Sequence, residues 1–107
     1  MSRIRYAAAI LLAALSVGPQ AASAATIQIT MQNLAFSPVE TSAKVGDTIE
    51  WINKDILTHS ATARNDDWDV TIAANKTVTM VLTKASDVEY YCRFHPNMKG
   101  HLTITPE

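Results

Sequence analysis

The sequence predicts an all-β domain with the architecture of an antiparallel β-sandwich. Short segments alternate apolar and polar residues with a period of two, which is typical of half-buried strands. Turn-forming pairs such as Gly46-Asp47 separate these segments at close intervals. From residue 26 onward, no stretch of helical period is long enough to predict a helix. Many short strands with frequent turns are typical of a sandwich.

Seven strands are predicted along the chain, and the alternation is clearest at residues 77–83. The other predicted strands cover residues 26–31, 39–45, 48–53, 57–64, 88–92 and 101–105, with an acidic loop at residues 65–69. After the first strand, residues 33–38 are predicted to form a turn. This turn carries two apolar residues that we expect to be buried anchors, Leu34 and Phe36.

Residues 1–24 are predicted to be a cleavable signal peptide. Two arginines near the start precede an apolar run at residues 6–17, and an A-x-A cleavage pattern ends at Ala24. The run is shorter than the roughly 20 residues that a membrane-spanning helix needs. Cleavage is expected after Ala24, or after Ala25 as the second choice. We therefore expect a single domain at residues 25–107, exported to the periplasm without stable membrane insertion.

The composition of this domain excludes several classes of function. Removing Arg3 and Arg5 from the 9 basic residues leaves 7, against 10 acidic residues. No basic run or stripe remains, so the domain is not expected to bind nucleic acid. Cys92 is the only cysteine and cannot form an intramolecular disulfide. An unpaired cysteine in an oxidising compartment needs a reason, and a metal ligand is one.

Residues 90–102, YYCRFHPNMKGHL, bring three metal-binding side chains close together. Cys92 lies on the same face of its strand as Val88 and Tyr90, so we expect it to point into the core. Pro96 and Gly100 interrupt the strand after it, which predicts a loop that carries His95 and Met98. Thiolate, imidazole and thioether are part of the donor set of a blue-copper site, which also needs a second histidine.

Two histidines are candidates for this second position. His59 lies in the predicted strand at residues 57–64 and would come from a neighbouring strand. His101 precedes Leu102 and Ile104, so it should face solvent if those two residues face the core. The alternative is a structural zinc site that combines Cys92 with all three histidines. An enzyme is not expected, because four ligands would leave no open position for a substrate.

Two sequence motifs resemble small cupredoxins, especially the amicyanin, pseudoazurin and plastocyanin group. They are VGDT with WIN at residues 45–53, and YC-x2-HP-x-M-x-G at residues 91–100. The resemblance covers about residues 26–105. It implies a Greek-key sandwich and a role in carrying single electrons between redox partners. It also implies one type 1 copper ion, whose ligands would be His59, Cys92, His95 and Met98.

The resemblance further implies that His95 reaches the surface within an apolar collar of Phe94, Pro96 and Met98. This collar would dock a redox partner, either a c-type cytochrome or a dehydrogenase or oxidase. Arg93 and Lys99 would steer the encounter, and we expect the carrier to be a monomer. A copper-buffering or copper-delivery protein with the same ligands is the alternative function.

Two positions depart from the family pattern. Many relatives have asparagine directly after the first histidine, where it ties the two ligand loops together, but this chain has Ser60. Amicyanins typically have small residues or proline between the cysteine and the second histidine. This chain has the bulky pair Arg93-Phe94 there.

Overall fold

The computed structural model describes residues 23–107, so the predicted signal peptide lies outside it except for its last two residues. Nine strands and no helix form this part of the chain. The strands are β1 (Thr26–Gln32), β2 (Ala35–Ser37), β3 (Glu40–Lys44), β4 (Thr48–Asn53), β5 (His59–Ala63), β6 (Asp69–Ile72), β7 (Thr77–Val81), β8 (Ser86–Tyr91) and β9 (Lys99–Thr105). Residues 23–107 contain no helix that is long and apolar enough to cross a bilayer.

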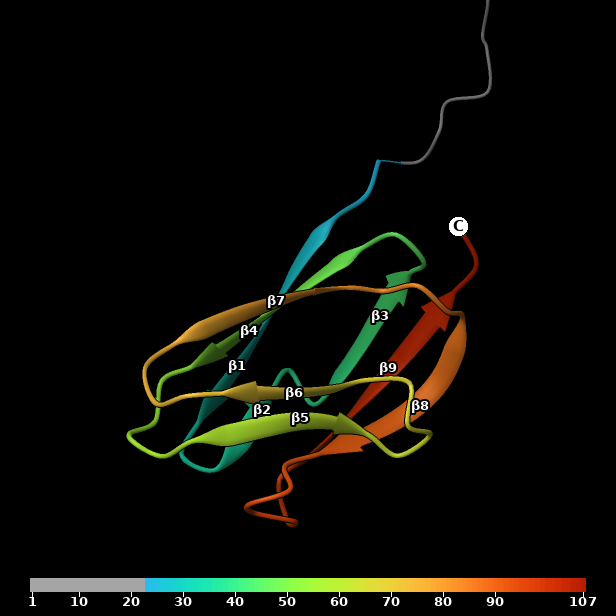
Figure 1. Cartoon of the computed structure of the whole chain (residues 1–107). Helices are drawn as coiled ribbons and strands as arrows, with labels where there is room; N and C mark the ends of the chain where they lie inside the picture. The colour runs from blue at the N-terminus through green and yellow to red at the C-terminus, as the bar shows by residue number, and fades with distance from the viewer. Residues whose placement is uncertain (1–22) are drawn as a thin grey trace, which may run out of the picture.

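The strands form two sheets, which confirms the predicted β-sandwich (Figure 1). One sheet has the order β2-β1-β4-β7 and the other has the order β3-β9-β8-β5-β6. The sheets are mixed rather than purely antiparallel, because β1 pairs with β4 and β3 pairs with β9 in parallel. The chain crosses to the second sheet for β3 and returns for β4, so β4 enters beside β1 in the same direction.

Two short strands were not predicted. β2 lies inside the predicted turn, where Asn33 and Leu34 have φ angles of 54° and 60° and close a tight hairpin. Phe36 is a buried anchor as expected, whereas the expectation for Leu34 is wrong, since 48% of it is exposed. β6 follows the acidic loop and alternates exposed residues with half-buried or buried ones over only four positions, the shortest run that predicts a strand.

Aromatic side chains fill the core beneath the end of β8. The ring centroid of Tyr90 lies 4.8 Å from that of Phe36, 5.1 Å from that of Trp51 and 5.5 Å from that of Trp68. Tyr90 also covers Gly100 on β9, where a Cβ atom would collide with the phenol ring. This packing leaves little freedom to the last residues of β8, which lead directly to Cys92.

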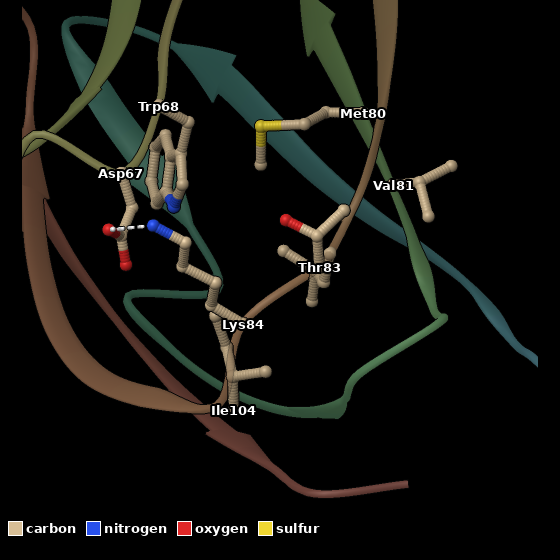
Figure 2. A pocket seen from close by; sticks show the side chains of 8 residues that line it. Asp67, Trp68, Met80, Val81, Thr83, Lys84 and Ile104 are labelled. Carbon is tan, nitrogen blue, oxygen red and sulfur yellow. Dashed lines mark ion pairs between the residues drawn. The ribbon is translucent and has the colours of Figure 1, made fainter.

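A hollow opens on one side of this core, between Trp68 and the end of β7 (Figure 2). Lys84 reaches across its rim, and its Nζ lies 3.6 Å from Oδ1 of Asp67. None of the four predicted metal ligands lines this hollow. It is therefore separate from the candidate site.

Candidate metal centre

Three of the predicted ligand side chains converge in the structure. The Nδ1 atoms of His59 and His95 lie 3.2 Å apart, and each lies 3.7 Å from Sγ of Cys92. They form the one cluster of three potential metal-binding side chains found among histidine, cysteine and acidic residues in the described part of the chain. Two of them are buried and His95 is half-buried, so the cluster lies just below the surface.

The spacing of these three atoms fits a bound metal ion. Typical zinc–protein bonds are about 2.0 Å to nitrogen and about 2.3 Å to sulfur. With bond angles between tetrahedral and trigonal, such bonds place the two nitrogens about 3.3–3.5 Å apart and each about 3.5–3.7 Å from the sulfur. The observed separations agree with these values to within about 0.2 Å. Thiolate and imidazole donors, with the thioether of Met98 carried by the same loop as Cys92 and His95, favour copper among the first-row metals.

His59 opens β5 and is fully buried. Its Nε2 donates to Oδ2 of Asp55 at 2.8 Å, so the lone pair of Nδ1 is free to face Cys92. The same carboxylate accepts the backbone N–H groups of Asn33 and Leu34, which tie it to the β1–β2 turn. Burial favours the neutral acid at Asp55, but the hydrogen bonds that it accepts outweigh this effect and lower its pKa.

The loop between β8 and β9 places the other predicted ligands. Cys92 is fully buried, as expected from the alternation in β8. Its N–H donates to the carbonyl of Met98 at 3.1 Å, while the N–H of His95 donates to the carbonyl of Cys92 at 3.2 Å. The N–H of Met98 donates to the carbonyl of His95 at 2.8 Å. These three bonds fold the loop tightly and bury Met98, which is 2% exposed.

His101 lies away from the cluster, as the strand alternation predicted. Leu102 and Ile104 are buried, and the half-buried His101 contacts the carboxylate of Asp87 through Nε2. A zinc site that recruits His101 is therefore not formed by this arrangement.

Ser60 joins the two segments that carry the ligands. Its backbone N–H donates to Sγ of Cys92 at 3.3 Å, and its hydroxyl accepts the backbone N–H of Arg93 at 2.8 Å. The Ser60 and Thr62 hydroxyls lie 2.9 Å apart, and Thr62 donates to Oδ1 of Asp69 at 2.8 Å. Since Thr62 uses its proton for Asp69, Ser60 donates to Thr62.

The side chain of Arg93 closes this network into a ring. Its Nε donates to Oδ1 of Asp69 at 3.0 Å, and its Nη2 donates to Oγ1 of Thr71 at 3.0 Å. The hydrogen bond from Thr62 and the nearby guanidinium of Arg93 lower the pKa of Asp69, against the opposing effect of burial. Arg93 therefore fastens the ligand loop to β6, a role that the sequence did not reveal.

Comparison with known proteins agrees with this geometry. A family model described as a cupredoxin-like domain matches residues 5–104. The chain belongs to the cupredoxin-like family. This finding confirms the resemblance inferred from the two motifs.

Solved cupredoxin-like structures share the fold. A purple cupredoxin from Nitrosopumilus maritimus is 23% identical, with a TM-score of 0.66 over 74% of this chain and 99% of that one. Amicyanin from Paracoccus versutus is 19% identical, with a TM-score of 0.64; the match covers 74% of this chain and 80% of the amicyanin chain. A reduced Cu(I) form of a proline-to-glycine amicyanin variant is 24% identical, with a TM-score of 0.64; the match covers 79% of this chain and 86% of the variant chain.

Proposed function

We propose that this cupredoxin-like protein is an electron carrier that holds one copper ion with His59, Cys92, His95 and Met98. The observation that carries the proposal is the convergence of one thiolate and two imidazole nitrogens at metal-binding distances. Copper in such a site supplies a one-electron couple between Cu(I) and Cu(II). The Cu(I) form of a related amicyanin variant supports the choice of metal.

The surroundings of the donor atoms suit electron transfer. Asp55 fixes the ring of His59, and the N–H of Ser60 donates to the sulfur of Cys92. Hydrogen bonds of this kind orient ligands and set the redox potential of a metal site. Because the ligand loop is closed by its own backbone bonds, the donor atoms have little freedom to move when the charge changes.

His95 is proposed as the point where the electron leaves. It is half-buried and lines a shallow hollow together with Leu34, Phe94 and Pro96. Leu34 and Phe94 are 48% and 50% exposed, so apolar surface surrounds the histidine. We propose that this surface docks a c-type cytochrome or a dehydrogenase or oxidase through a small, short-lived interface.

The charges near this surface indicate which basic residue would steer the encounter with a redox partner. Arg93 is engaged with Asp69, so its positive charge is largely balanced. Lys99 follows the ligand loop and is exposed, without an ion pair in the described part of the chain. We therefore assign the steering role to Lys99. The protein would act in the periplasm as a monomer, after removal of residues 1–24.

Voltammetry of the copper-loaded protein in the presence of a Cu(I) chelator tests this function. An electron carrier should undergo repeated one-electron oxidation and reduction and keep its copper, because all four donors are held by the fold. Loss of copper to the chelator on each reduction would instead indicate the copper-buffering or copper-delivery protein. A chain that binds no copper would contradict both functions.

A further inference from the structure

Asp47 is an almost buried carboxylate at the turn between β3 and β4. Only 6% of the residue is exposed. Its Oδ1 accepts the backbone N–H of Ala25 at 2.8 Å, and its Oδ2 accepts the backbone N–H of Lys44 at 2.9 Å. Its own carbonyl accepts the N–H of Leu82 at 2.8 Å. Asp47 therefore connects the start of β1, the end of β3 and the end of β7.

The charge of this carboxylate has no ion-pair partner in the described residues. None of the ion pairs within residues 23–107 includes Asp47. Lys44 exerts a longer-range attraction, but its side chain forms no ion pair with the carboxylate. Carboxylates with so little exposed surface are usually paired with a cation. The two hydrogen bonds come from neutral backbone groups, and the oxygens can accept further donors.

Ala25 is held in place by both of its backbone groups. Its N–H donates to Asp47, and its carbonyl accepts the N–H of Thr48 at 2.9 Å. It is also the residue that would become the amino terminus if the signal peptide is removed after Ala24. The backbone nitrogen next to Asp47 is thus the nitrogen that cleavage would convert into an amine.

We propose that cleavage of the Ala24–Ala25 peptide bond supplies the missing cation, as an α-ammonium group that pairs with Asp47. A signal peptidase would catalyse the addition of water across this peptide bond. Ala24 leaves as a carboxylate, and the amine of Ala25 takes up a proton at neutral pH. The neutral N–H of Ala25 is thereby replaced by a charged group with three N–H donors. Its position is already fixed, because the carbonyl of Ala25 accepts the N–H of Thr48. Removal of the signal peptide then adds this ion pair to the fold of the mature chain.

The proposal also selects between the two expected cleavage sites. Cleavage after Ala24 leaves the nitrogen of Ala25 beside Oδ1 of Asp47. Cleavage after Ala25 would remove this nitrogen, leaving Thr26 as the first residue and Asp47 with the Lys44 N–H as its donor. The proposal rests on the export of the protein proposed above, but it does not depend on copper.

Residues 25–107 contain all nine described strands, so the test uses this chain. A chain with a free Ala25 amine is compared by urea unfolding with the same chain acetylated at Ala25, in the native sequence and in Asp47→Asn. The free amine should raise the unfolding midpoint in the native sequence, and this gain should disappear in Asp47→Asn. Equal midpoints in the native sequence, or an equal gain in Asp47→Asn, would overturn the ion pair.

Titration of the Ala25 amine by NMR gives a second test that needs no substitution. Pairing with Asp47 should raise the pKa of the amine about one unit above its ordinary value of roughly 7.7–8.0. An ordinary value in the folded protein would overturn the proposal.

The mass of the exported protein tests export and the cleavage site separately from the ion pair. A chain that keeps residues 1–24 would contradict export. A first residue other than Ala25 would contradict the proposed cleavage site. A chain that begins at Ala25 but has an ordinary amine pKa would contradict the ion pair alone.

Discussion

The hydroxyl of Ser60 accepts the backbone N–H of Arg93 at 2.8 Å and so ties β5 to the ligand loop. Many relatives have an asparagine at the position of Ser60 that ties the two loops together. The shorter serine makes the same connection here, with support from Thr62 and Asp69. Two apparent departures from the family pattern, Ser60 and Arg93, are therefore parts of one network.

Replacement of Ser60 by alanine should destabilise the fold. Ser60→Ala leaves the part-buried N–H of Arg93 without its acceptor, which typically costs about 1–3 kcal/mol of unfolding free energy. Urea unfolding of the copper-free protein measures this loss. Ser42→Ala is the matched control, because Ser42 is exposed on β3. Equal losses in the two variants would show that the Ser60 hydroxyl has no special role.

Charge reversal at Lys99 should slow electron transfer with a small anionic reagent such as hexacyanoferrate. Lys99→Glu places negative charge on the residue that follows the ligand loop, so the rate at low ionic strength should fall several-fold and recover as salt screens the charge. Lys84→Glu changes the net charge equally at the separate hollow of Figure 2. If both variants slow the reaction equally, net charge acts without local steering.

Addition of a methyl group at Gly100 should also destabilise the fold. The ring of Tyr90 occupies the space that the Cβ of Gly100→Ala would need. Overpacking of this kind costs about 1–3 kcal/mol, measured as the free energy of unfolding in urea. Thr103→Ala on the same strand is the control, since Thr103 is half-buried. A Gly100→Ala protein as stable as the native one would contradict the described packing.

Asp47 should make the protein less stable in acid. The backbone N–H of Ala25, followed by that of Lys44, lowers the pKa of Asp47 in the folded state. Its contribution is therefore complete above the unfolded pKa of about 3.9 and is lost as the pH falls through the lower folded pKa. Urea unfolding between neutral and acid pH should show the native protein and Asp47→Asn converging in stability. A pH-independent difference would contradict this assignment.

Much of the fold could be predicted because a strand with one buried face alternates apolar and polar residues in its sequence. Alternation is visible where one face packs on the core, as in β4. β6 alternates in the same way, but over only four residues that begin inside the predicted acidic loop, so it was not predicted. The parallel pairings of β1 with β4 and β3 with β9 depend on where the chain changes sheets, which local periodicity does not record.

The ligands of the candidate site could also be predicted from the sequence, whereas the network around them could not. Cys92, His95 and Met98 lie in one short motif, and the face of the strand indicates where Cys92 points. The ring through Ser60, Thr62 and Asp69 was not predictable, because it depends on the pairing of β5 with β6. That pairing places Thr62 opposite Asp69, and β6 was one of the two strands that were not predicted.

The proposed function requires Cys92 and its neighbours to hold a copper ion for electron transfer. The most direct test is the visible and EPR spectrum of the copper-loaded protein, compared with that of Cys92→Ser. We expect one copper per chain and an intense visible absorption that requires the thiolate, so Cys92→Ser should be colourless. A colourless native protein, or equal colour in Cys92→Ser, would contradict a copper centre bound through Cys92.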